Sequence, residues 1–129
     1  MPYELSFAKA LPPLDLDEYI NPCCIGGDVV VRHLLPSVTG RYTDMQTNQE
    51  DWGWFIWMRE GNVALAIDVH TDDHERGLFR IHLTSRIKRR LFSDRVEDTP
   101  ELDQLRTIVI ERLEQWVDGA VDSERIEPD

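Results

Sequence analysis

Cysteines and long apolar runs are both scarce in this 129-residue chain. The two cysteines are adjacent, at Cys23 and Cys24. Neighbouring cysteines form a disulfide only in a strained ring, so the pair predicts no disulfide framework and fits a reducing compartment. The densest apolar run, residues 52–58, is far shorter than the roughly 20 residues of a membrane-spanning helix. Residues 1–4 lack the basic and apolar regions of a signal peptide, and we therefore expect a cytoplasmic protein without a membrane partner.

Motifs that bind nucleotides or activate nucleophiles are also lacking. The chain has no Walker phosphate loop, dinucleotide glycine fingerprint, Cys-x-x-Cys pair or nucleophile-elbow serine, and each absence excludes a large class of enzymes. Gly26 and Gly27 follow the two cysteines, and a glycine turn can aim backbone amides at an oxyanion. No helix signal or basic residue lies beside Cys23 or Cys24 to activate a thiol, so the sequence favours an inert pair.

Positive charge is scarce outside one segment. The chain carries 25 acidic and 14 basic residues, for a net charge of −11. Residues 76–90 hold six basic residues and no acid, whereas residues 1–75 and 91–129 carry net charges of −9 and −8. This charge disfavours an extended nucleic acid, and it favours solubility or a cationic protein partner. The basic segment either contacts an anion or is neutralised by the protein's own acidic residues.

Alternating apolar and polar residues predict antiparallel strands. Residues 3–8 have a period of two and predict a first strand. The valine-rich residues 28–35 predict a second strand that stops before Pro36. Residues 36–51 are polar and aperiodic, which is typical of a loop. Residues 52–88 then predict three hairpin-linked strands, an antiparallel meander.

A helix is predicted near the C-terminus. Thr99 is a capping residue before Pro100, a typical first helical residue, and Gly119 is a stop signal. The predicted fold is therefore α+β, with about five antiparallel strands and one long C-terminal helix across one face of the sheet. We expect a single domain over residues 1–121 and an acidic, frayed tail over 122–129. The apolar stripe of the helix comprises Leu102, Leu105, Val109, Leu113, Trp116, Val117 and Ala120.

Strand parity separates the meander into two faces. A tight turn at Gly61 places one apolar set together, and this face is expected to receive the helix, with Trp52, Trp54 and Trp116 as core anchors. That set comprises Trp52, Trp54, Ile56, Met58, Val63, Leu65, Ile67, Val69, Phe79, Ile81, Leu83 and Ile87. The second face carries Phe55, Trp57, Arg59, Ala64, Ala66, Asp68, His70, Arg80, His82, Thr84 and Arg86.

The second face has two open interpretations. Either the N-terminal segment or a second subunit covers it, or it is an open groove for a ligand or protein partner. A homodimer through this face would satisfy parts of both. The sequence favours a non-catalytic protein-binding module, which is inhibitor- or immunity-like and docks on a basic partner, or which associates with itself. Because tryptophan and arginine dominate interface energetics, the expected partner-binding residues are Phe55, Trp57, Arg59 and Arg86.

A cluster of aspartate, histidine and arginine on this face supports the alternative of a small enzyme or ligand-binding domain. Asp68, His70 and His82 would supply a general base, and Arg80 would hold an anionic substrate. His70, His74 and His82 are weak candidate ligands for a divalent metal, because the first two are four residues apart but span a strand end and a turn. Structural ion pairs and a polar turn account for the same residues, and we expect no cofactor.

Overall fold

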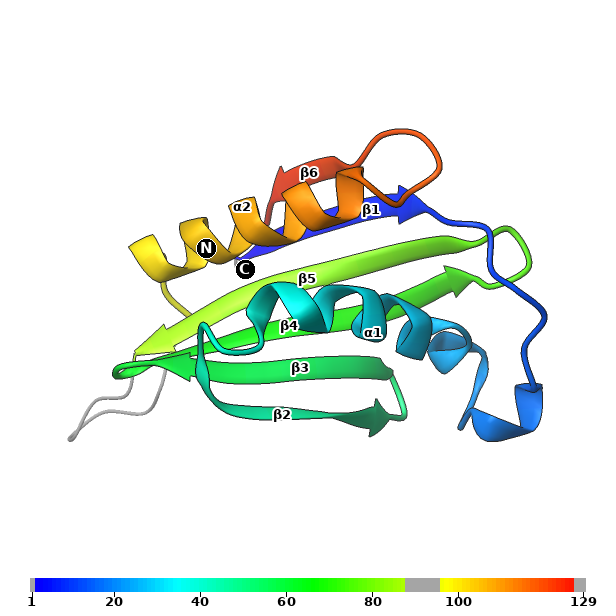
Figure 1. Ribbon diagram of the computed structural model, residues 1–129, viewed down its shortest axis with the longest axis horizontal. Helices are drawn as coiled ribbons and strands as arrows, with labels where there is room; N and C mark the ends of the chain where they lie inside the picture. Colours follow the sequence, from blue (N-terminus) through cyan, green and yellow to red (C-terminus); the bar gives the residue numbers. More distant parts are fainter. Residues whose placement is uncertain (1, 88–95, 127–129) are drawn as a thin grey trace.

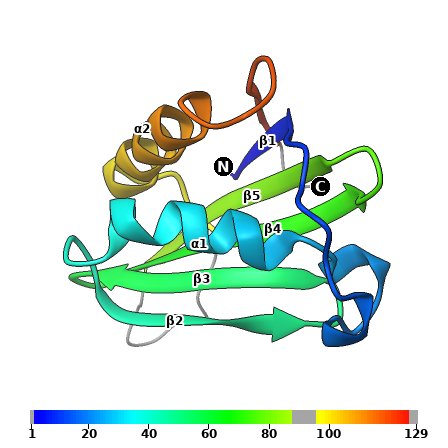
Figure 2. The same cartoon turned by 45° about the vertical axis from the view of Figure 1, so that its right-hand side comes forward.

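The computed structural model describes residues 2–87 and 96–126. These residues form a six-stranded antiparallel sheet with two α-helices on one of its faces (Figures 1 and 2). The elements are β1 (Tyr3–Ala8), α1 (Gly27–Val38), β2 (Thr43–Glu50), β3 (Gly53–Glu60), β4 (Val63–Asp73), β5 (Leu78–Ile87), α2 (Pro100–Glu114) and β6 (Asp122–Arg125). Two short 3-10 turns, η1 (Leu16–Glu18) and η2 (Pro22–Cys24), precede α1.

The strand order is β2-β3-β4-β5-β1-β6, which confirms the α+β class and the antiparallel sheet. The meander predicted over residues 52–88 is present as β3, β4 and β5. The sheet has one strand more than the predicted five. The N-terminal strand β1 lies between β5 and β6, so it is part of the sheet and does not fold across a face. Within the described residues, no helix is long and apolar enough to cross a bilayer.

Helix α1 corrects the strand predicted at residues 28–35. Val30, Val31, Leu34 and Val38 are buried, and their helical spacing turns one side of α1 toward the sheet. Valine favours strands by propensity, but packing of an amphipathic face overrides so small a preference. The helix also continues through Pro36, which removes one backbone hydrogen bond near the helix end without ending the helix.

Strand β2 corrects the loop predicted at residues 36–51. Among the described strands it lies at the edge of the sheet and pairs with β3, and most of its side chains are exposed. A strand that buries neither face needs no alternation of apolar and polar residues. The polar sequence of β2 therefore gave no signal from which a strand could be predicted. The register shifts between Thr43 and Gln46, and Asp44 in this bulge has a φ of 54°.

Helix α2 begins where predicted but ends at Glu114, before Gly119. The Thr99 hydroxyl caps it by accepting a hydrogen bond from the Leu102 backbone amide at 3.0 Å. The frayed tail expected from residue 122 is wrong for residues 122–125, which form β6 against β1. An unpaired β1 edge supplies hydrogen-bonding groups that such a polar segment satisfies. Residues 127–129 of the predicted tail lie outside the described residues.

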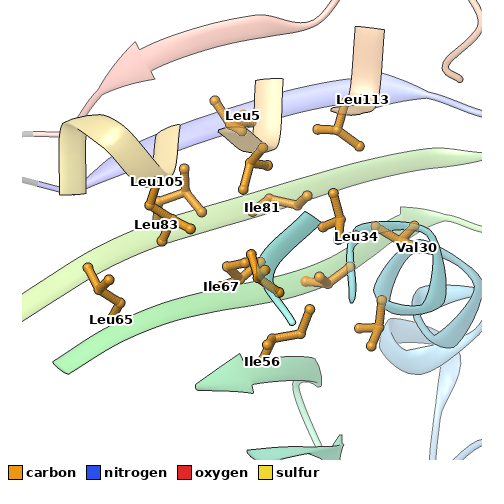
Figure 3. Packing of buried hydrophobic residues seen from close by; sticks show 14 of the residues in the cluster. Leu5, Val30, Leu34, Ile56, Leu65, Ile67, Ile81, Leu83, Leu105 and Leu113 are labelled. Atoms are coloured by element: carbon orange, nitrogen blue, oxygen red, sulfur yellow. The ribbon is translucent and has the colours of Figure 1, made fainter. Parts of the chain in front are cut away.

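The hydrophobic core lies between the sheet and the two helices (Figure 3). Trp54 and Trp116 pack against this core, as predicted. Trp52 does not, because it lies in the turn between β2 and β3, where strand parity no longer holds, and its ring lies near His70 and Phe55. The fully buried side chains include Leu5, Val30, Leu34, Ile56, Ile67, Ile81, Leu83, Leu102, Leu105 and Leu113.

Candidate functional site

The face of the sheet opposite α1 and α2, which we call the open face, carries the predicted site residues. Strand pairing sets them in cross-strand rows, since residues opposite each other on neighbouring strands point to the same face. One row runs Phe55, Asp68, His82 and Glu4, a second runs Trp57, Ala66 and Thr84, and a third runs Arg59, Ala64 and Arg86. His70 and Arg80 form a further pair.

Trp57 is a large, exposed and rigidly held aromatic side chain on the open face. Trp57 is 40% exposed to solvent, whereas Phe55, on which it stacks, is 5% exposed. The two rings stack with centroids 3.9 Å apart. The Trp57 indole Nε1 donates a hydrogen bond to Asp68 Oδ1 at 3.0 Å. Stacking and the hydrogen bond together hold the indole in one orientation before any partner arrives.

Beside Trp57 the open face is hollowed. This space, which we call the Trp57 hollow, has a volume of about 430 Å³. Alanines on β4 leave the space, because longer side chains at those positions would fill it. The volume falls within the roughly 300–1,000 Å³ of small-ligand sites. The hollow is lined by Trp57, Arg59, Ala64, Ala66, Thr84 and Arg86, with Asp44, Gln46 and Asp68 also around it.

Arg59 and Arg86, which line the hollow, differ from Arg80 in their ion pairs. Arg80 Nε lies 3.0 Å from Asp72 Oδ1, and its Nη1 lies 3.2 Å from Glu4 Oε1. Within residues 2–87 and 96–126, no carboxylate forms an ion pair with Arg59 or Arg86. Arg80 is thus neutralised by Asp72 and Glu4, whereas no described carboxylate pairs with Arg59 or Arg86.

The Asp, His and Arg cluster predicted as an alternative active site is present, but most of its members bind one another or their neighbours. His82 Nε2 lies 3.1 Å from Glu4 Oε1, and His70 Nδ1 lies 3.1 Å from the Trp52 carbonyl oxygen. The two imidazole rings meet edge to face with centroids 5.0 Å apart. Sequence reasoning missed Glu4, because the alternation of residues 3–8 does not reveal which strand β1 joins.

Burial and hydrogen bonding perturb three groups of this cluster. Burial is the main cause that raises the pKa of Asp68, against the opposing hydrogen bond from Trp57. Burial likewise lowers the pKa of His70. The pKa of Glu4 is lowered, first by its hydrogen bond with His82 and also by Arg80. Asp68 and His70 are therefore both shifted toward their neutral forms at the centre of the face.

The three histidines proposed as metal ligands do not converge. His74 lies in the β4–β5 turn and lines a separate hollow with Leu11 and Leu14. His70 instead lies on the open face, with its ring against Trp52 and His82. In the part of the chain that the structure describes, no group of three His, Cys, Asp or Glu side chains could hold a metal ion.

The adjacent cysteines lie away from the Trp57 hollow and are both free. Cys23 is exposed and Cys24 is buried. The Cys24 thiol lies 2.9 Å from the Glu50 carbonyl oxygen, and burial raises its pKa. A buried thiol whose pKa is raised is a poor nucleophile, so Cys24 serves packing.

No protein-family model, curated protein or solved structure matches this chain, so its function is inferred from the geometry of the open face.

Proposed function

We propose that this protein is a non-catalytic binding module that recognises another protein through the open face, with Trp57 as the anchor. The observation that carries the proposal is the state of Trp57, which is 40% exposed yet held by Phe55 and Asp68. Exposed aromatic side chains contribute most to binding when they are already ordered, because little conformational entropy is lost. The adjacent hollow offers space for a side chain of the partner.

Charge supports a partner that is basic overall. The net charge of −11 attracts a cationic protein at long range and raises its association rate. It also repels a second copy of the chain, so we take the occupant of the open face to be a different protein. Contacts within the face are more specific, because Arg59 and Arg86 stand beside Trp57 and select the group that docks there.

The competing hypothesis is an enzyme or ligand-binding site built on Asp68, His70, Arg80 and His82. Two of these residues are already engaged by Glu4, since Arg80 forms an ion pair with it and His82 lies within hydrogen-bond distance of it. A substrate would have to displace these contacts before it could use either side chain. Protein recognition requires no such rearrangement, and we therefore favour it.

The test compares partner capture by the wild-type protein with capture by two variants that each carry one alanine substitution. Trp57→Ala removes the anchor, and Leu16→Ala is the control, because Leu16 is 52% exposed in the η1 turn. We expect a protein that wild type and Leu16→Ala retain but that Trp57→Ala loses by about tenfold or more. The same loss must be reproduced by calorimetry with the purified pair, after circular dichroism shows that both variants fold.

Two results would overturn this proposal. A purified partner that binds Trp57→Ala as tightly as wild type would mean that the anchor lies elsewhere. Native mass spectrometry provides the second check, on self-association at low and high salt. A dimer that Trp57→Ala dissociates would identify the occupant as a second copy and refute the recognition of a different protein.

A further inference from the structure

Arg59 and Arg86 form a pair of cations around a small residue. Each is directly opposite Ala64, Arg59 on one neighbouring strand and Arg86 on the other. Adjacent strands are about 4.8 Å apart, so the two arginine backbones are separated by about 10 Å. A long side chain between them would keep the guanidinium groups apart, but the methyl group of Ala64 leaves the space above it open. Both arginines line the Trp57 hollow.

No described carboxylate forms an ion pair with either arginine, although acids outnumber bases in the chain and Arg86 is near enough to Asp68 to interact with its charge. Arg80, four residues before Thr84 on the same face of β5, shows the contrast, because Asp72 and Glu4 both pair with it. Two neighbouring cations that no described carboxylate pairs with repel each other, and an anion placed between them relieves this repulsion. Arginine also offers forked hydrogen-bond donors that match a carboxylate.

The remaining walls of the hollow favour an anion attached to an apolar group. Trp57 presents an indole ring, Ala66 a methyl group, and Thr84 a methyl group and a hydroxyl. The hydrogen bond from its Nε1 to Asp68 favours one orientation of the indole. A ligand with both a charge and a flat or aliphatic part would therefore contact the arginines and the indole together.

The charge of the ligand is limited by the acids nearby. Asp44 and Asp68 also line the hollow, and the whole chain has a net charge of −11. Each additional negative charge on a ligand increases repulsion from these groups, whereas the two arginines suffice for one carboxylate. A singly charged carboxylate is thus favoured over a phosphate.

We propose that the Trp57 hollow is a carboxylate-binding subsite, which takes an aspartate or glutamate side chain next to an apolar residue of the partner. This rests on the proposed function, since it names the group that the partner inserts beside Trp57. It also assigns a role to Arg59 and Arg86 that is separate from neutralisation of the protein's own acids.

The test uses benzoate as the probe, because it joins one carboxylate to a flat apolar ring. Proton–nitrogen correlation spectra report on binding through the Trp57 indole signal, which is assigned by its loss in Trp57→Phe. We expect benzoate to shift this signal and to saturate in the millimolar range, whereas neutral benzamide, of the same shape, leaves it nearly unchanged. Arg59→Gln and Arg86→Gln should each weaken benzoate binding by about fivefold. Arg32→Gln is the matched control, since Arg32 is an exposed arginine on α1.

Any of the following results would overturn the carboxylate assignment. Benzamide could shift the signal as much as benzoate, or both arginine variants could bind benzoate as wild type does. Phenyl phosphate could also bind more tightly than benzoate, which would assign the hollow to a phosphorylated group. If benzoate fails but partner capture still requires Trp57, only this inference fails. If benzoate binds but capture is independent of Trp57, the protein-recognition function fails, and the inference falls with it.

Discussion

Truncation of Leu113 to alanine tests the packing of α2 on the sheet most directly. Leu113 is completely buried in the last turn of α2, in the same cluster as Leu5 and Leu34 (Figure 3). Leu113→Ala removes three carbon atoms from this cluster. At about 0.8 kcal/mol for each buried methylene, the lost transfer free energy is about 2.4 kcal/mol.

The cavity that remains adds to this cost. The space left by three carbons is about 60 Å³, which at about 24 cal/mol per Å³ costs about 1.5 kcal/mol if the neighbours do not move. Partial collapse of α1 and β1 around the site reduces the second contribution. We therefore expect Leu113→Ala to lower the free energy of unfolding by about 3–4 kcal/mol. This is a large part of the roughly 5–15 kcal/mol typical of a small domain.

Urea unfolding followed by circular dichroism measures the difference, with Glu114→Ala as the control. Glu114 is exposed at the C-terminal end of the same helix, where a negative charge is unfavourable for the helix dipole. Its removal should leave stability unchanged or slightly higher. A loss below about 0.5 kcal/mol for Leu113→Ala would place this side of α2 in solvent and refute the packing described here.

Two further predictions concern the backbone of β3 and the acid dependence of the open face. Gly53→Ala should lower stability by about 2 kcal/mol or more, because a Cβ at its φ of 150° would collide with the Val69 carbonyl oxygen. In melting experiments Gly61→Ala should cost clearly less, since its φ is also positive but its Cβ would meet open space; equal losses would contradict the collision. Glu4 has a lowered pKa in the folded protein, so its stabilising contribution is present above about pH 4.5 and is lost as the pH falls through the lower folded value. Glu4→Gln should therefore lose less stability between about pH 6 and pH 3 than wild type in urea unfolding, and parallel pH curves would refute a role for the His82 contact.

Most of the candidate site could be predicted from local sequence. Residues of β3, β4 and β5 alternate, and tight connections fix the register of neighbouring strands, so Trp57, Asp68 and Arg86 could be assigned to one face. The start of α2 could also be predicted locally, because the capping side chain of Thr99 lies next to the helix that it begins. None of these assignments required knowledge of distant residues.

Other features depended on contacts between distant segments. The valines of α1 suit a strand or a helix, and packing against β3, β4 and α2 selects the helix. Strand β6 is polar and forms because the edge of β1 is available to it. The partners of Arg80 and His82 were also hidden, because Glu4 reaches them from 76 and 78 residues away.

Within β3, β4 and β5 the sequence by itself determined which side chains share a face, because the pleat of a strand is set by bonded neighbours. It therefore placed Trp57 with Arg59 and Arg86 on the side of the sheet away from α2. Only the tertiary structure decided that Arg80 is neutralised by Glu4 and Asp72, whereas Arg59 and Arg86 pair with no described acid. Ion pairing depends on which strands become neighbours, and strand order is settled by packing across the whole chain rather than by any local pattern.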